Sequence, residues 1–228
     1  EMCIRDRFFH VPLTEQPEYN GTQLIHSKVI ASYLRQLLRN DLQYAPFRME
    51  GMEQDVREMM EIDTPQGKLA LQIGGTIDRL DSKGDTLRIV DYKTGGTPKT
   101  PENIEQLFTP ADNRPNYIFQ TFLYAAILCR KQSLKVAPSL LYIHRAASES
   151  YSPVIEMGAP RQPKVPVNNF AFFEDEFRER LHGLLQEIFS QEETFSQTED
   201  TRKCEYCDFR SLCTVSYTHL TLPTNSLV

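Results

Sequence analysis

The chain has 228 residues, of which 40% are hydrophobic and 25% are charged, and its formal net charge at pH 7 is −6. This composition is typical of a soluble globular protein with one large domain, or with one domain and appendages. No stretch reaches the roughly 20 consecutive apolar residues that span a bilayer, and the N-terminus lacks the apolar core of a secretory signal. We therefore expect a cytoplasmic protein without a membrane partner. The acidic balance argues against a surface coated in positive charge, but it does not exclude a basic groove for nucleic acid.

The spacing of apolar residues predicts an α/β protein. Apolar residues recur at helical spacing in three segments, and strand-like runs bounded by turn residues lie between them. A turn at 82–85 joins the first two strands into a β-hairpin. In chain order, we expect a helix over 24–42, strands over 68–81 and 86–93, a helix over 115–130, strands over 138–145 and 151–157, and a helix over 173–188.

The two ends of the chain join no periodic pattern. Their sequences resemble translated adapter read-through, so residues 1–10 and 216–228 are expected to be non-native ends; ordinary disordered termini are the alternative. We expect neither end to carry chemistry. Between them we expect one α/β domain over 11–200 and a cysteine-rich motif over 201–215.

Two acids and one amine on the predicted hairpin carry the strongest chemical signal. Asp91 and Lys93 lie two residues apart on a strand, so their side chains share one face, about 6.6 Å apart in Cα rise. Hairpin pairing can bring Asp78 beside Asp91, and the backbone carbonyl of Tyr92 adds another oxygen. Mg²⁺ and Mn²⁺ prefer such all-oxygen sites. Because buried charges are costly unless they are paired or bound to metal, these residues predict a metal-binding cleft.

An Asp-x-Lys pair is also common on solvated strand faces, where it has no function. Two neighbouring features favour a functional site. Gly75 opens a Gly-x-x-Asp sequence on the first strand of the hairpin, and Gln120 and Tyr124 stand one turn apart on one face of the following helix.

These three elements resemble the RecB-type branch of the PD-(D/E)xK nuclease superfamily, whose motifs read G-x-x-D-R-x-D, V-D-Y-K-T-G and Q-x-x-x-Y. The resemblance implies a restriction-endonuclease-like mixed β-sheet flanked by helices and a Mg²⁺- or Mn²⁺-dependent hydrolysis of DNA. It implies that Asp78 and Asp91 bind the metal and that Lys93 positions or activates the attacking water. Because two neighbouring carboxylates should keep Lys93 charged, we expect it to orient the water and not to act as a free general base. It also implies that Gln120 and Tyr124 line the cleft.

A second constellation, C-x₂-C-x₅-C, is formed by Cys204, Cys207 and Cys213. It resembles the iron–sulfur staple of AddB-type helicase–nuclease subunits and of CRISPR-adaptation nucleases, which implies a [4Fe–4S] cluster. The fourth ligand is not identified, because Cys3 lies in the non-native end and Cys129 is interpreted as a buried residue of a helix. A zinc site is the competing interpretation, and three free thiols are the alternative without metal.

The family's upstream G-x-x-x-H element has no clear counterpart. The nearest candidate, His26, has the wrong spacing and is interpreted as a helix-surface residue. We therefore expect the nuclease-like domain over 11–200 to be truncated at its N-terminus.

The motifs lead to one principal functional hypothesis and two alternatives. We expect a Mg²⁺-dependent deoxyribonuclease, an exonuclease domain of an AddB-like subunit that repairs double-strand breaks with a helicase–nuclease partner. The alternatives are a non-catalytic DNA-end-binding module and a stand-alone CRISPR-adaptation-type exonuclease. Phosphate contacts from a local positive lip supply affinity without sequence information. The candidates for these DNA contacts are Arg79, Lys99, Arg114 and Arg145.

Overall fold

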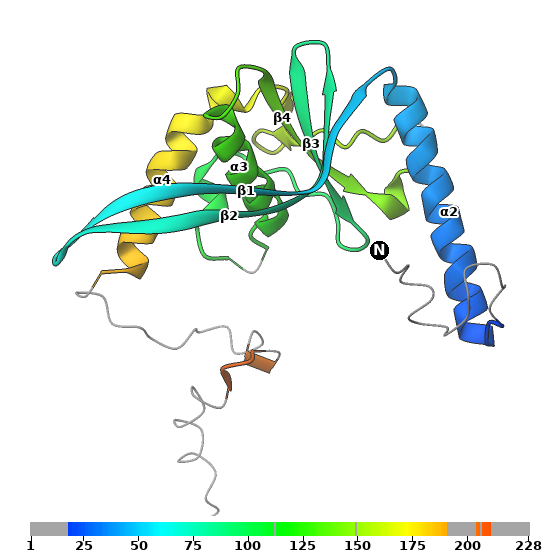
Figure 1. Cartoon of the computed structure of the whole chain (residues 1–228), viewed down its shortest axis with the longest axis horizontal. Coiled ribbons are helices and arrows are strands. Elements are labelled where there is room, and N and C mark those ends of the chain that lie inside the picture. The colour runs from blue at the N-terminus through cyan, green and yellow to red at the C-terminus, as the bar shows by residue number, and fades with distance from the viewer. Residues whose placement is uncertain (1–17, 112, 149, 191–203, 206, 211–228) are drawn as a thin grey trace, which may run out of the picture. The chain divides into compact units, whose positions relative to one another are not determined.

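The computed structural model describes residues 18–111, 113–148, 150–190, 204–205 and 207–210. The chain divides into two compact units, residues 1–186 and 187–228, which are described separately. Figure 1 shows the helices and strands. In chain order they are α2 (Gly21–Tyr44), β1 (Arg48–Thr64), β2 (Gly67–Lys83), β3 (Thr86–Lys93), α3 (Asn116–Cys129), β4 (Lys135–Tyr142), β5 (Glu156–Met157), β6 (Val165–Pro166) and α4 (Glu174–Ile188).

Four strands form one mixed sheet in the order β1-β2-β3-β4. β1, β2 and β3 are successive antiparallel neighbours, whereas β3 and β4 run parallel. Parallel neighbours need a crossover connection, and the chain between these two strands contains α3. β5 and β6 form a separate two-stranded sheet. The central mixed sheet flanked by helices confirms the expected restriction-endonuclease-like α/β class.

Helices cover both faces of this sheet. Ile89 and Val90 are neighbours on β3 and are both 0% exposed, so β3 is buried on its two faces. Ile89 belongs to the larger apolar core, which includes Phe122 of α3 and Phe177 of α4. Val90 belongs to a smaller cluster on the other face, in which Leu141 and Ile143 pack with Tyr33 and Leu37 of α2.

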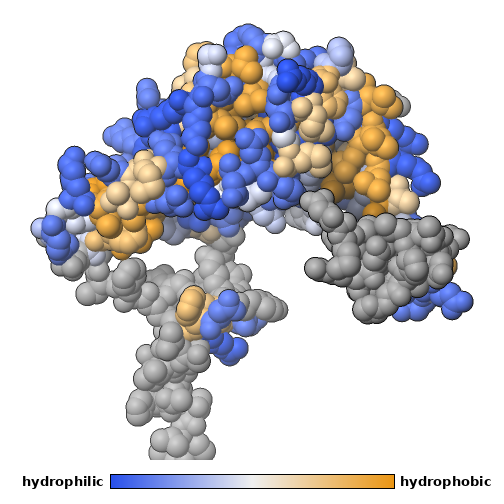
Figure 2. All heavy atoms as spheres, viewed as in Figure 1, coloured by the Kyte–Doolittle hydropathy of each residue, from blue (hydrophilic) through white to orange (hydrophobic). Residues whose placement is uncertain are grey.

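The first helix begins and ends at recognisable signals. Asn20 and Gln23 form a capping box, in which each side chain accepts a hydrogen bond from the other residue's backbone N–H, both 2.9 Å long. Pro46, which cannot continue a helix, follows its last residues. α2 also keeps apolar side chains in solvent, and Figure 2 shows apolar surface gathered over this helix. The most exposed are Ile25, Leu38 and Leu42, at 62%, 63% and 75%.

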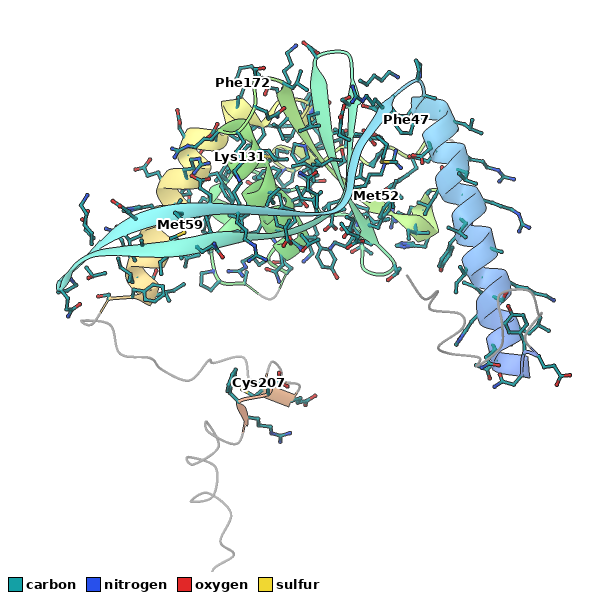
Figure 3. The ribbon with its side chains drawn as sticks, viewed as in Figure 1. Phe47, Met52, Met59, Lys131, Phe172 and Cys207 are labelled. Atoms are coloured by element: carbon teal, nitrogen blue, oxygen red, sulfur yellow. The ribbon has the colours of Figure 1, made fainter. Side chains whose placement is uncertain are left out.

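Strand β1 was not among the predicted elements. Its sequence is rich in Met, Glu and Arg, which are residue types that favour helices, and it shows no regular alternation. β1 is the edge of the sheet and pairs with β2 over most of its length, so much of its side-chain surface remains in solvent. Met52 and Met59, at 65% and 58% exposure, project from it in Figure 3. The strand is therefore specified by pairing with β2 and not by its own pattern.

Two predicted strands differ from the structure. The strand expected over 138–145 ends at Tyr142, and Ile143–Arg145 form a turn of 3₁₀ helix. The strand expected over 151–157 is reduced to Glu156–Met157, with one isolated bridge between Ser139 and Val154. Pro153, which has no N–H to donate, interrupts the run that the apolar pattern predicted.

The remaining elements are confirmed. The helices expected over 24–42, 115–130 and 173–188 correspond to α2, α3 and α4, and the predicted hairpin is β2–β3. Gly84, with φ of 62°, occupies its turn in the left-handed region that favours glycine. The domain boundaries expected after residues 10, 200 and 215 lie outside the described residues. No helix in the described part of the chain is long and apolar enough to cross a membrane.

Candidate metal and phosphodiester site

The candidate site lies where β3 separates from β2. The ladder between these strands runs from the Lys83–Thr86 pair to the Arg79–Val90 pair and stops there. The next position in the same register would place Asp78 opposite Asp91. Instead of a ladder bond, the carboxylate of Asp78 accepts a hydrogen bond of 2.8 Å from the backbone N–H of Tyr92.

Strand β2 is irregular next to Asp78. Ile77 and Leu80 both lie in the larger core although they are three residues apart, so the alternation of faces is interrupted between them. On the facing strand, Glu53 has φ of 48° and, like Glu50, has no ladder pair. Asp78 lies close enough to Asp91 for its negative charge to raise the pKa of that acid.

Asp91 and Lys93 form a buried ion pair. The Lys93 Nζ lies 2.6 Å from Asp91 Oδ2, and the two side chains are 15% and 5% exposed. Burial raises the pKa of Asp91, the Lys93 ammonium lowers it, and the Asp78 carboxylate raises it, with a net upward shift. The Asp91 anion is therefore held in a place that disfavours its charge, and a cation bound beside it would offset this effect.

Helix α3 supplies the other wall of the site. Lys93 Nζ donates a long hydrogen bond of 3.4 Å to Gln120 Oε1, and Gln120 Nε2 donates one of 3.0 Å to Tyr124 Oη. The ring of Tyr117 lies below the ammonium, 4.3 Å from Nζ to its centroid. The structure thus links Gln120 directly, and Tyr124 through Gln120, to Lys93. Tyr117 was not among the residues that the sequence predicted at the site. Its spacing of three residues from Gln120 and seven from Tyr124 nevertheless puts it on the same helix face.

The donor set fits a hard divalent ion. Asp91 Oδ2 is buried, and its contact with Lys93 lacks hydrogen-bond geometry, so this oxygen has an acceptor position open. Two carboxylates and a nearby carbonyl match the oxygen ligands of Mg²⁺ and Mn²⁺. In the described part of the chain no three His, Cys, Asp or Glu side chains gather at one point. The protein would therefore supply Asp78, Asp91 and the Tyr92 carbonyl, with water or phosphate completing the shell.

Comparison with known families decides the assignment. The sequence pattern of the PD-(D/E)XK nuclease superfamily matches residues 3–214. The chain belongs to the PD-(D/E)XK nuclease superfamily. No curated protein matched the chain. Membership indicates a nuclease, which would bind DNA, and nucleases of this superfamily typically use divalent metal ions.

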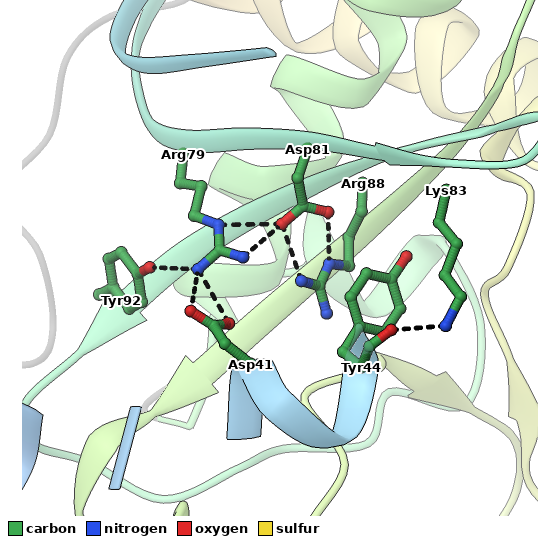
Figure 4. A network of polar contacts seen from close by, with 7 residues as sticks. All are labelled: Asp41, Tyr44, Arg79, Asp81, Lys83, Arg88 and Tyr92. Carbon is green, nitrogen blue, oxygen red and sulfur yellow. Dashed lines mark hydrogen bonds and ion pairs between the residues drawn. The ribbon is translucent and has the colours of Figure 1, made fainter. Parts of the chain in front are cut away.

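One expected DNA contact of this nuclease domain is buried. Arg79 is 3% exposed, and its guanidinium donates to Asp41, Asp81 and the phenol oxygen of Tyr92 (Figure 4). On β2 it faces α2 and not the side of Asp78 and Asp91, because it follows Asp78 in the strand. Arg79 therefore has no exposed donor for a phosphate, and we do not retain it as a DNA contact.

The other three cations line two adjoining hollows beside the site. One hollow, of about 270 Å³, is lined by Lys99 and Arg145, and the other, of about 320 Å³, by Lys99 and Arg114. Both include Tyr142, and the second includes Tyr117, which contacts Lys93. Lys99 Nζ is anchored by the backbone carbonyls of Asn113 and Arg114. The positive groups thus line hollows that border the candidate site.

The cysteine motif is described only in part. Cys204 and Cys207 are free thiols in a tight turn, in which the Cys207 N–H donates to the Cys204 carbonyl at 3.4 Å. Cys213 and Cys3 lie outside the described residues, so the cluster remains a prediction. Cys129 lies on α3, where burial and the nearby Glu174 raise the pKa of its thiol to about 11. His26 is exposed on α2, as expected.

Proposed function

We propose that this chain is a Mg²⁺- or Mn²⁺-dependent deoxyribonuclease domain. The observation that carries the proposal is the convergence of Asp78, Asp91 and Lys93 at the end of β3, with one buried oxygen of Asp91 left without a hydrogen bond. Membership in a superfamily of nucleases supports the same reaction.

The residues divide the chemistry between them. A divalent ion held by Asp78 and Asp91 would polarise a phosphate oxygen and lower the pKa of a bound water. The Lys93 ammonium lies beside Asp91, where it would orient the attacking water and stabilise the negative charge that develops on the phosphoryl oxygens. Gln120 and Tyr117 hold that ammonium in position through a hydrogen bond and a ring contact.

The DNA backbone would pass along the two hollows. Lys99, Arg114 and Arg145 supply positive charge beside the catalytic residues, and Tyr117 and Tyr142 line the same walls. Such contacts position a strand without reading its bases. The substrate strand would then reach Lys93 from the side of Tyr117.

We also propose an AddB-like context for the domain, as an exonuclease that repairs double-strand breaks with a helicase–nuclease partner. The support is the C-x₂-C-x₅-C spacing of Cys204, Cys207 and Cys213, which suits an iron–sulfur cluster of the full protein. Zinc is the competing metal at these thiols.

The test is cleavage of end-labelled single- and double-stranded DNA with Mg²⁺, Mn²⁺ or EDTA. We expect metal-dependent products that vanish with EDTA and fall at least about 100-fold in Asp91→Asn. The matched control is Asp63→Asn, which removes an exposed carboxylate from β1 and should cut at the wild-type rate. Salt-dependent binding without cleavage at any metal concentration would contradict the proposal and favour a DNA-end-binding module.

A further inference from the structure

Two consecutive residues of β2 hold one residue of β3 from opposite faces. The Asp78 carboxylate accepts from the backbone N–H of Tyr92 at 2.8 Å, and Arg79 Nη1 donates to the phenol oxygen of Tyr92 at 3.1 Å. Because neighbours on a strand point to opposite faces, the two bonds fix both the backbone and the side chain of Tyr92.

These side-chain bonds stand where the regular ladder has ended. The antiparallel pairing of β2 with β3 stops at the Arg79–Val90 pair, one residue before Asp91. The segment Asp91–Lys93 keeps its parallel pairing with β4, from Leu140 to Tyr142. On the β2 side, therefore, the segment that carries the acid and the amine is held through Tyr92.

Arg79 is itself held rigidly. Its Nη1 donates to both carboxylate oxygens of Asp41 at 2.9 and 2.8 Å, and its Nε donates to Asp81 Oδ2 at 2.9 Å. Arg88 binds both oxygens of the same Asp81 at 2.9 and 2.8 Å (Figure 4). The charges of two arginines and two aspartates cancel, which limits the free-energy cost of burying them. The network therefore adds little to the net free energy of unfolding.

We propose that Arg79 is a positioning residue for the catalytic segment and acts through the phenol of Tyr92. The inference rests on the proposed function in one respect, which is that Asp91 and Lys93 are the reacting groups. The fixed guanidinium determines the backbone conformation at Tyr92. This conformation in turn determines how the Tyr92 carbonyl and the side chains of Asp91 and Lys93 face the metal. The Arg79 network thus serves the geometry of the site from the opposite face of the sheet.

The decisive variant is Tyr92→Phe, which removes only the phenol oxygen and leaves the bonds of Arg79 to Asp41 and Asp81 intact. Loss of one hydrogen bond to a charged donor should speed amide exchange over residues 91–94 by about 5- to 10-fold. It should weaken Mn²⁺ binding in calorimetric titrations by about 3- to 10-fold. DNA cleavage should lose about 10-fold in kcat with an unchanged KM for DNA. The matched control is Tyr33→Phe, which removes a hydroxyl from the same apolar cluster and should change none of these quantities.

A second variant, Arg79→Lys, retains the positive charge but loses the planar fork, and it should reproduce the Tyr92→Phe defects. If Tyr92→Phe lowers the melting temperature but leaves the 91–94 exchange, Mn²⁺ affinity and kcat unchanged, Arg79 is only structural and the inference is overturned. If the wild-type protein cuts no DNA, the proposed function fails, but amide exchange and Mn²⁺ binding still decide whether Arg79 positions this segment.

Discussion

Gly75 lies so close to Tyr124 that a Cβ at this position would meet the phenol oxygen at 2.6 Å and Cε1 at 3.0 Å. The contact explains the glycine that opens the Gly-x-x-Asp sequence. A side chain there would displace Tyr124, whose phenol oxygen accepts a hydrogen bond from Gln120. Gln120 itself accepts a hydrogen bond from Lys93. The motif glycine is therefore linked to the Lys93 ammonium through two side chains, Tyr124 and Gln120.

Gly75→Ala should displace Tyr124 and disturb the Lys93 ammonium. We expect a loss of about 1–3 kcal/mol in the free energy of unfolding, from overpacking, together with a clear drop in kcat. Urea denaturation and cleavage assays measure the two effects. Gly21→Ala is the control, because a Cβ at Gly21 meets no atom within 4 Å and both quantities should stay close to wild-type values. An unchanged kcat in Gly75→Ala would show that the tyrosine does not support the amine.

Removing one member of the Asp91–Lys93 pair should be worse for stability than removing both. Lys93→Gln leaves a 5% exposed carboxylate without its cation, and we expect a loss of about 2 kcal/mol in unfolding free energy. The double variant Asp91→Asn/Lys93→Gln should recover most of this stability but none of the activity. A double-mutant cycle of urea denaturation curves measures the coupling. Additive losses would mean that the pair does not interact in the fold.

Arg178 should be the main electrostatic contact of α4. It is 8% exposed, binds Glu58 of β1 and Glu174 of its own helix, and donates to the Ala126 carbonyl of α3. Arg178→Ala leaves Glu58 and Glu174 with only the more exposed Arg130 and should cost about 3 kcal/mol in unfolding free energy. Arg180→Ala on the same helix removes an exposed pair and should cost less than about 0.5 kcal/mol. Similar losses in both variants would argue against the buried network.

Arg145 should contribute to DNA affinity through a phosphate contact. It is exposed and lines the hollow next to Tyr142. Arg145→Gln should weaken DNA binding equally for all sequences and reduce the slope of log affinity against log salt by about 1. Fluorescence anisotropy over a range of salt concentrations measures the slope. Lys68→Gln, at the far end of the β1–β2 hairpin, should leave it unchanged. An unaltered slope in Arg145→Gln would place the DNA elsewhere.

Cys129 should resist alkylation in the folded protein at pH 8. Burial and Glu174 raise the pKa of its thiol from 9.0 to about 11, so little nucleophilic thiolate is present. Cys207, which is exposed, should react readily unless it binds metal. Because the unfolded thiol ionises first, the stability that Cys129 contributes is complete below about pH 9 and declines as the pH rises toward 11. Peptide mass spectrometry after iodoacetamide treatment tests the order of reactivity, and equal labelling would contradict it.

The sequence was most informative where side chains alternate on a buried strand. It predicted the β2–β3 hairpin and the shared face of Asp91 and Lys93, because period-two alternation is a local property. It missed β1, whose Met- and Glu-rich edge is specified by pairing with β2. It also assigned Arg79 to DNA, because a charge in the sequence does not reveal whether another element, here α2 with Asp41, folds over it.

Strand β3 belongs both to a local hairpin and to a distant parallel pair. The hairpin closes through the turn after Lys83, but the parallel partner of Asp91–Lys93 is synthesised only after residues 94–134 have followed. Contacts between residues far apart in sequence form late, since the loop between them must first close. A nascent chain therefore carries both acids and the lysine well before it can align them, and we expect ribosome-bound chains that end before residue 142 to leave labelled DNA uncut.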